Sequence, residues 1–238
     1  MVASVAAVSM NEDPPSALAV RVWDLPTRLF HWALAVCVVA SVVSANVGGN
    51  AMTWHFRLGY TVFTLLAFRV LWGLVGGRWS RFSSFWPTPG RLRRYLSARA
   101  VPGEWLDVGH NPLGSLSVLA MLGLLAVQVG SGLVADDEIA NLGPLNRFVS
   151  SATAHAATGW HKRWGQWLLI ALVVLHVAAI AGYRLRRGLD LVRPMLVGDK
   201  ALPPGTPQSA DSAWHRLLAL AIAALCGLAV GWVVALGD

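Results

Sequence analysis

Histidines inside apolar segments are the residues of this chain whose chemistry most needs an explanation. His161 and His176 share one such segment, WHKRWGQWLLIALVVLHVAAIAGYRLRR, which begins at Trp160. A helix rises about 1.5 Å and turns about 100° per residue, so the two histidines would lie about 22 Å apart along the axis and about 60° apart around it. Both rings can therefore face one bundle interior. A histidine in hydrocarbon needs a partner, because an unsatisfied polar group there costs several kcal/mol.

The composition identifies hydrocarbon as the surroundings of these histidines. Of the 238 residues, 55% are hydrophobic and only 13% are charged, and the mean hydropathy is +0.55. Soluble domains carry roughly 25% charged residues, which they need for their water-exposed surface. The 12 tryptophans, many beside the ends of apolar segments, are typical of interfacial aromatic belts. The sequence therefore predicts an integral membrane protein.

Five apolar stretches are near the ~20 residues that a membrane-spanning helix needs. They cover residues 28–47, 54–76, 113–135, 161–183 and 214–236. The predicted fold is an all-α integral membrane protein, in which a four-helix transmembrane bundle is followed by a fifth, C-terminal transmembrane helix. The chain before residue 21 carries Pro14 and Pro15 among small residues, which predicts a disordered tail over 1–20.

Basic residues predict the orientation in the membrane. Arginines and one lysine concentrate in two segments that would lie on the same side, after the second and fourth helices: Arg78, Arg81, Arg91, Arg93, Arg94, Arg99, Arg184, Arg186, Arg187, Arg193 and Lys200. The positive-inside rule then places the N-terminus in the cytoplasm and the C-terminus outside. The net charge of +7 is explained by this topology, so no nucleic-acid partner is predicted.

With this orientation, four histidines fall into two pairs by depth. His31 and His176 lie near the cytoplasmic side, and His55 and His161 lie near the outer side. Imidazole suits zinc, copper or iron. Zinc sites usually have four ligands around one ion, and the two histidine pairs are too far apart to bind the same ion. Two axial ligands on facing helices are what a six-coordinate haem requires.

Other residues near these pairs allow both a cofactor role and a packing role. Glycines one turn from a ligand, or along the third helix, would leave room for a porphyrin edge or would pack against a neighbouring helix: Gly59, Gly123, Gly130, Gly132 and Gly165. Arg69 lies fourteen residues beyond His55, at the depth of the cytoplasmic pair. Its guanidinium would meet a haem propionate or a quinone-site group, or would extend to the interface.

The remaining polar candidates stay open. His110 could meet a propionate or a quinone, although an interfacial histidine is usually solvated. His155 and His215 have the pattern of surface or interface residues, and Gln128 could bond a helix or a cofactor. The acidic run 136–138 predicts either a solvated loop or a docking patch for a basic partner.

Four segments of the chain resemble the bacterial cytochrome b561 family, within the group related to the cytochrome b subunit of nickel–iron hydrogenase. They are VRVWDLPTRLFHWALA, WHFRLGYTVFTLLAFRVLWGLVGGRWSRFSSF, GHNPLGSLSVLAMLGLLAVQVGSGL and HKRWGQWLLIALVVLHVAA. The resemblance covers roughly residues 20–197 and leaves the fifth helix outside. It implies a dihaem four-helix domain over 21–197. The sequence itself predicts a cytoplasmic linker over 198–213 and the additional helix over 214–238.

The resemblance also implies the ligands, two haem b groups and a location in the bacterial inner membrane. His31 and His176 would hold the cytoplasmic-side haem, and His55 and His161 the outer one, with Arg69 beside the former. The expected function is electron transfer between the quinone pool and an outer-side redox partner, such as a periplasmic cytochrome or a hydrogenase-type subunit. Haem does the one-electron chemistry, so no side chain is expected to act as nucleophile or general base.

Two other functions stay as alternatives. A direct oxidoreductase of a small substrate, such as superoxide or ferric chelates, would use the same haems, with Lys162 and Arg163 steering an anion. A non-redox transporter or scaffold would use the histidines for protons or metals. The sequence leaves open whether the fifth helix contacts a partner or another copy in a homo-oligomer.

Overall fold

The computed structural model describes residues 17–99, 101 and 103–237, and five of its helices are long and apolar enough to cross a membrane. They are α1 (Leu25–Val47), α2 (Met52–Val75), α5 (Pro112–Leu133), the unbroken helix made of α6 (Ser151–Gly159), η3 (Trp160–Gly165) and α7 (Gln166–Arg187), and α9 (Ala213–Ala235). The prediction of an all-α, multi-pass membrane protein is confirmed.

The fourth spanning helix begins at Ser151 and not at 161 as predicted. Its start is capped by the Ser150 hydroxyl, which accepts a hydrogen bond from the Thr153 N–H at 3.2 Å. The following alanines favour a helix although they are not strongly apolar. His155, predicted in a loop, therefore lies on α6.

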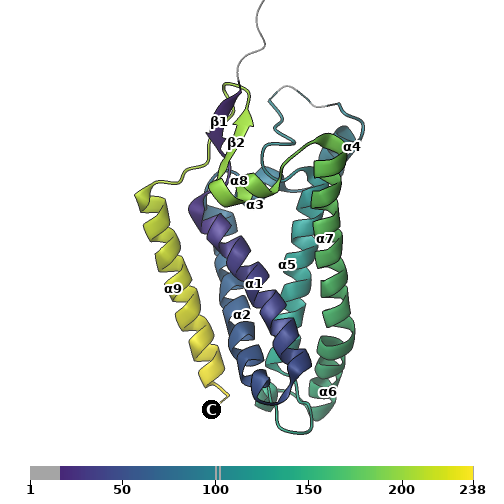
Figure 1. Cartoon of the computed structure of the whole chain (residues 1–238). Coiled ribbons are helices and arrows are strands. Elements are labelled where there is room, and N and C mark those ends of the chain that lie inside the picture. The colour runs from purple at the N-terminus through teal and green to yellow at the C-terminus, as the bar shows by residue number, and fades with distance from the viewer. Residues whose placement is uncertain (1–16, 100, 102, 238) are drawn as a thin grey trace, which may run out of the picture.

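Figure 1 shows α1, α2, α5 and α7 side by side in a bundle, with α9 along one flank. The strands β1 (Leu18–Arg21) and β2 (Asp199–Leu202) cover one end of the bundle, which we call the sheet end; α6 and the chain between α5 and α6 form the opposite end, the loop end. Short helices complete both ends: η1 (Gly49–Ala51), α3 (Phe82–Phe85), α4 (Pro89–Leu96), η2 (Asn146–Phe148) and α8 (Val192–Val197).

The two strands were not predicted. They pair antiparallel, with Leu18 opposite Leu202 and Arg21 opposite Asp199. The Arg21 guanidinium bonds the carboxylates of Asp199 at 2.6 Å and Asp211 at 2.9 Å, which ties the chain before α1 to the chain before α9. The expected tail over 1–20 thus ends in ordered backbone at 18–20, and the expected linker over 198–213 contains a strand, because each segment satisfies the backbone groups of the other. Residues 1–16 lie outside the described residues.

A buried carboxylate joins α1 to the end of α2. Asp24 is fully buried and caps α1, accepting from the Thr27 N–H at 2.8 Å. The same carboxylate accepts hydrogen bonds from Trp72 Nε1, the Gly77 N–H and the Ser80 hydroxyl. A side chain at Gly77 would collide with it. Asp24 therefore holds the sheet-end turn of α2 in place.

Apolar packing divides the bundle into a four-helix part and a flank. Val62, Leu66, Leu125 and Leu169 bring α2, α5 and α7 together at mid-height. On the other side of α2, buried Ala219 and Cys226 attach α9 to Phe68 and Trp72. The fifth helix thus packs outside the four-helix bundle, in which α1, α2 and the η3–α7 helix carry the predicted ligands. Both cysteines of the chain are free.

Candidate cofactor-binding site

The four predicted ligands form two facing pairs at opposite ends of the bundle. The ring centres of His31 and His176, the sheet-end pair, are 6.4 Å apart, and those of His55 and His161, the loop-end pair, are 5.8 Å apart. Two imidazoles on opposite sides of one metal ion, with metal–nitrogen bonds of about 2 Å, have ring centres roughly 6 Å apart. Both pairs therefore have the spacing of axial ligands.

Backbone carbonyls fix the orientation of both rings in the loop-end pair. His55 Nδ1 lies 2.9 Å from the carbonyl oxygen of Ser41 on α1, and His161 Nδ1 lies 2.8 Å from that of Gln128 on α5. A carbonyl only accepts, so each Nδ1 carries the proton and donates it. In the neutral ring the lone pair is then on Nε2, which is the arrangement of a metal-ligating histidine.

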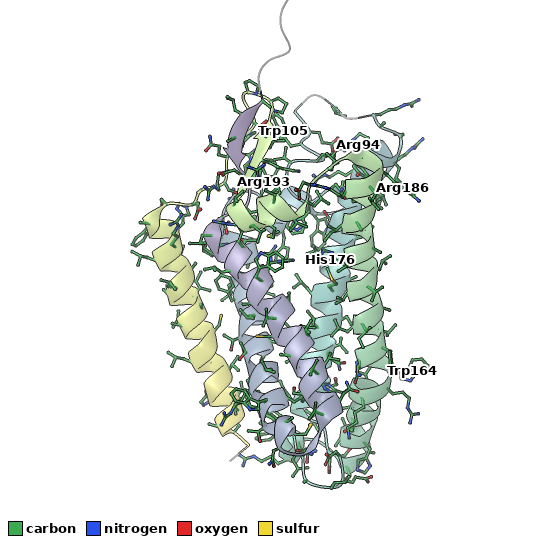
Figure 2. All side chains as sticks on the ribbon, in the orientation of Figure 1. Arg94, Trp105, Trp164, His176, Arg186 and Arg193 are labelled. Carbon is green, nitrogen blue, oxygen red and sulfur yellow. The ribbon has the colours of Figure 1, made fainter. Side chains whose placement is uncertain are left out.

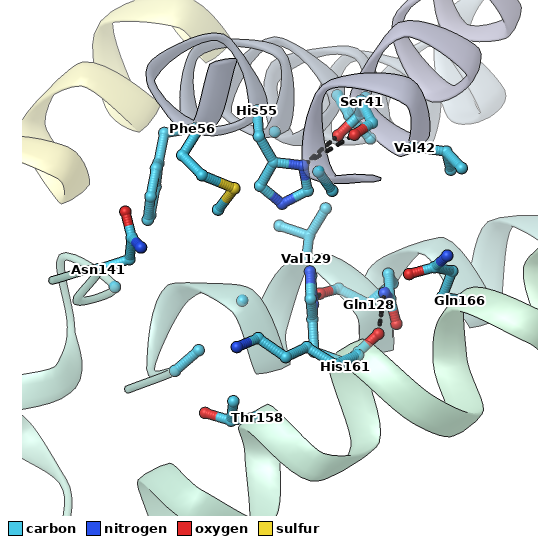
Figure 3. A pocket seen from close by; sticks show the side chains of 18 of the residues that line it. Ser41, Val42, His55, Phe56, Gln128, Val129, Asn141, Thr158, His161 and Gln166 are labelled. Carbon is cyan, nitrogen blue, oxygen red and sulfur yellow. Dashed lines mark hydrogen bonds between the residues drawn. The ribbon is translucent and has the colours of Figure 1, made fainter. Parts of the chain in front are cut away.

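A cavity of about 530 Å³ surrounds the loop-end pair, within the range of cofactor sites. Figure 3 shows His55 and His161 reaching into it from opposite walls, with the Ser41 and Gln128 contacts behind them. The wall is mostly apolar, and its polar lining residues include Asn46, Asp137, Asn141, Thr158 and Lys162. The His161 ring is carried by η3, a π-helical stretch, and such stretches are frequent at functional sites.

The predicted role of the glycines divides between the two alternatives. Gly59 and Gly132 line the loop-end cavity. Gly165 instead packs against the side-chain amide of Gln128, whose Nε2 donates to the His161 carbonyl at 2.8 Å. A Cβ added at Gly123 or Gly130 would have no neighbouring atom within 4 Å.

Gly132→Ala is expected to weaken cofactor binding at the loop end selectively. The new Cβ would lie 2.9 Å from His161 Cε1, closer than real Cβ contacts, so the ring must move away from its position opposite His55. The check is the cofactor content of the purified variant beside that of Gly123→Ala, where the added methyl meets open space. Equal content in the two variants would contradict the expectation.

The sheet-end pair lies beside a buried positive charge. Arg69 is only 2% exposed, and its guanidinium lies over the rings of Phe82 at 4.8 Å, Phe85 at 5.9 Å and Phe30 at 6.0 Å. Phe30 directly precedes His31, so Arg69 lies at the level of the sheet-end pair. Arg69 Nη1 and His31 Nδ1 are buried, and neither has a hydrogen-bond partner among the described residues.

His110 also reaches this end of the bundle and is not a solvated surface histidine. Its ring lies between Trp23 and Phe85, with centre distances of 4.7 and 4.6 Å. Burial lowers the pKa of His110 to about 3, and the positive charge of Arg69 contributes to the lowering. The imidazole is therefore neutral at physiological pH.

The other polar candidates lie away from both pairs or satisfy one another. His155 Nε2 contacts the Glu138 carboxylate at 3.0 Å, and His215 Nδ1 lies 2.8 Å from the Ser212 hydroxyl. Asp137 accepts bonds from the Asn141 side chain and from three successive backbone N–H groups, which hold the pKa of its carboxyl well below the usual range. The acidic run therefore builds its own turn.

Sequence reasoning missed Asp24 and the two carbonyls that orient the loop-end rings. The order Asp-Leu-Pro at 24–26, an N-cap residue followed by proline in the first turn, was a usable signal for the former. Backbone carbonyls leave no signal in a sequence. In the part of the chain that the structure describes, no group of three or more His, Cys, Asp or Glu side chains could hold a metal ion.

Comparisons with known proteins agree with this geometry. Residues 22–198 match the family described as prokaryotic cytochrome b561. A probable Ni/Fe-hydrogenase B-type cytochrome subunit of Azotobacter chroococcum is 28% identical, covering 76% of this chain and 88% of its own length. The corresponding hydrogenase 1 subunit of Escherichia coli K12 is 26% identical, covering 71% and 85%. The search of solved structures found no significant match.

Proposed function

The chain belongs to the prokaryotic cytochrome b561 family, and from that premise we propose that it is a two-haem membrane cytochrome. It would transfer electrons between the quinone pool and a redox partner on the outer side of the inner membrane. The observation that carries the proposal is the presence of two facing histidine pairs at opposite ends of one bundle, with ring spacings of 6.4 and 5.8 Å.

Each pair would hold one haem b. His55 and His161 are prepared for this role, because hydrogen bonds to carbonyls leave Nε2 of each ring unprotonated toward the cavity. His31 and His176 would hold the second haem, with Arg69 supplying positive charge beside its edge. When bound, a haem accepts and gives up one electron at a time, and its axial ligands and surroundings set the reduction potential.

The proposed orientation rests on where the arginines lie. Figure 2 places Arg94, Arg186 and Arg193 together at the sheet end, although they come from three different segments. The positive-inside rule puts this end in the cytoplasm. The N-terminus would then be cytoplasmic and the C-terminus periplasmic, and the loop-end pair would lie nearer the outer partner.

Relatives named as hydrogenase cytochrome subunits support a hydrogenase-type outer partner. The test uses the haem-loaded protein in vesicles that contain a quinone. A reduced hydrogenase-type iron–sulfur subunit, added at the loop end, should reduce the haems, and added quinone should reoxidise them. The haem absorption bands report both changes. Haems that the reduced partner cannot reduce, or that quinone cannot reoxidise, would contradict the proposal.

Direct oxidation of superoxide is not favoured by the loop-end cavity. Lys162 lines the cavity, as steering of an anion would require, but Asp137 lines it too. Because the pKa of Asp137 is lowered, this carboxylate is charged and offsets the attraction. Rapid haem reduction by superoxide without a protein partner would reverse this preference.

A further inference from the structure

Two buried nitrogens at the sheet end have no acceptor in the protein. Arg69 Nη1 and His110 Nδ1 are shielded from solvent and have no hydrogen-bond partner among the described residues. Buried polar groups in native proteins almost always have hydrogen-bond partners. A buried nitrogen without a partner in the protein therefore indicates a partner from outside the chain. The rings of Phe30, Phe82 and Phe85 interact with the Arg69 charge through their faces, but they do not replace an oxygen acceptor.

The two groups belong to one site. Both lie against the ring of Phe85, with the Arg69 guanidinium carbon 5.9 Å and the His110 ring centre 4.6 Å from its centre. The Arg69 guanidinium also lies 6.0 Å from the ring centre of Phe30, the residue before His31, and electrostatic interactions link His110 with His31 and His176. The site therefore stands beside the sheet-end pair.

The protein fixes both groups, but among the described residues no carboxylate accepts a hydrogen bond from Arg69 Nη1 or His110 Nδ1. Trp23 and Phe85 hold the His110 ring from two sides, and the next residue, Asn111, caps α5 by accepting the Gly114 N–H at 2.8 Å. The buried carboxylate nearest in the fold, Asp24, already accepts four hydrogen bonds. An oxygen acceptor supplied by a bound molecule would satisfy both nitrogens.

We propose that Arg69 and His110 together bind a propionate carboxylate of the haem held by His31 and His176, with His110 Nδ1 as a hydrogen-bond donor. This inference rests on the proposed function. It assigns to His110 a cofactor-binding role, through its Nδ1-protonated form. A bound quinone would also present oxygen acceptors, and the experiment below separates the two sources.

The test compares His110→Phe with the unmodified protein, both carrying haem labelled with carbon-13 at the propionate carboxyls. Phenylalanine keeps the ring between Trp23 and Phe85 and removes the N–H. In redox-difference infrared spectra, the labelled carboxylate band should shift. The midpoint potential of the sheet-end haem should fall by about 59 mV, a tenfold change in the reduction equilibrium, because the less neutralised carboxylate favours oxidised iron.

Two further variants make the result specific. His110→Gln, which restores an N–H donor, should recover most of the band position and potential. His155→Phe makes the same exchange on α6, at the loop end, and should change neither. If His110→Phe binds two haems with an unchanged band and potential, the inference is wrong while the proposed function stands. A raised KM for quinone with unchanged haem properties would assign the oxygen to quinone and also overturn it.

Discussion

Replacing His176 by leucine is expected to remove one of two haems and about half of the haem absorbance. The ring of His176 faces His31 at 6.4 Å, and leucine offers no lone pair to iron. The loop-end pair does not share a ligand with it, so His55 and His161 should still hold their haem. The measurement is the haem-to-protein ratio of the purified variant, with its reduced-minus-oxidised spectrum.

Two further variants, His161→Leu and His155→Leu, test whether the effect of His176→Leu is specific. His161→Leu should remove the other haem, leaving a residual spectrum that differs from that of His176→Leu because Arg69 stands beside only one pair. His155→Leu changes a histidine that is paired with Glu138 and should retain both haems. Full haem content in His176→Leu would refute the ligand role of that residue.

Replacing Asp24 by alanine is expected to destabilise the protein by about 3 to 5 kcal/mol. The change leaves the N–H groups of Thr27 and Gly77, Trp72 Nε1 and the Ser80 hydroxyl without their acceptor. It also removes a negative charge from the neighbourhood of Arg69. Thermal unfolding in detergent, followed by loss of haem absorbance, should show a clearly lower midpoint temperature than that of the unmodified protein.

Asp190→Ala is the matched control for this effect. The Asp190 carboxylate bonds Arg184 at 2.7 Å and accepts the Val192 and Arg193 N–H groups at 3.0 Å, but the Asp190 and Arg184 side chains are 39% and 61% exposed. An exposed ion pair contributes roughly 0 to 1 kcal/mol and a helix cap about 1 kcal/mol, so the midpoint should fall less than in Asp24→Ala. If Asp24→Ala unfolds at the same temperature as Asp190→Ala, the carboxylate of Asp24 does not have the structural role described above.

The sequence was sufficient for the spanning helices and for the depths of the histidines. An apolar run of ~20 residues has one stable form in a bilayer, a helix, and its fixed rise converts sequence position into depth. That is why position along the chain was enough to match His31 with His176 and His55 with His161. Arg69 was placed at the sheet-end level by the same reasoning.

Features that depend on distant contacts could not be predicted in this way. Pairing between β1 and β2 joins segments at opposite ends of the chain, and four-residue strands carry no clear periodicity. The π-helical stretch at Trp160–Gly165 turns by fewer degrees per residue than an α-helix, so the angle between His161 and His176 could not be taken from the spacing alone. The packing of the His110 ring between Trp23 and Phe85 likewise depends on residues from separate segments.

The most direct test is to quantify haem in the purified chain and to record its reduced-minus-oxidised spectrum. Four imidazoles in two facing pairs predict two haem b groups per chain, both low-spin and bound by two histidines. A chain that purifies without haem after expression with ample haem supply would contradict the central claim. So would a ratio of one haem per chain that His31→Leu and His55→Leu each leave unchanged.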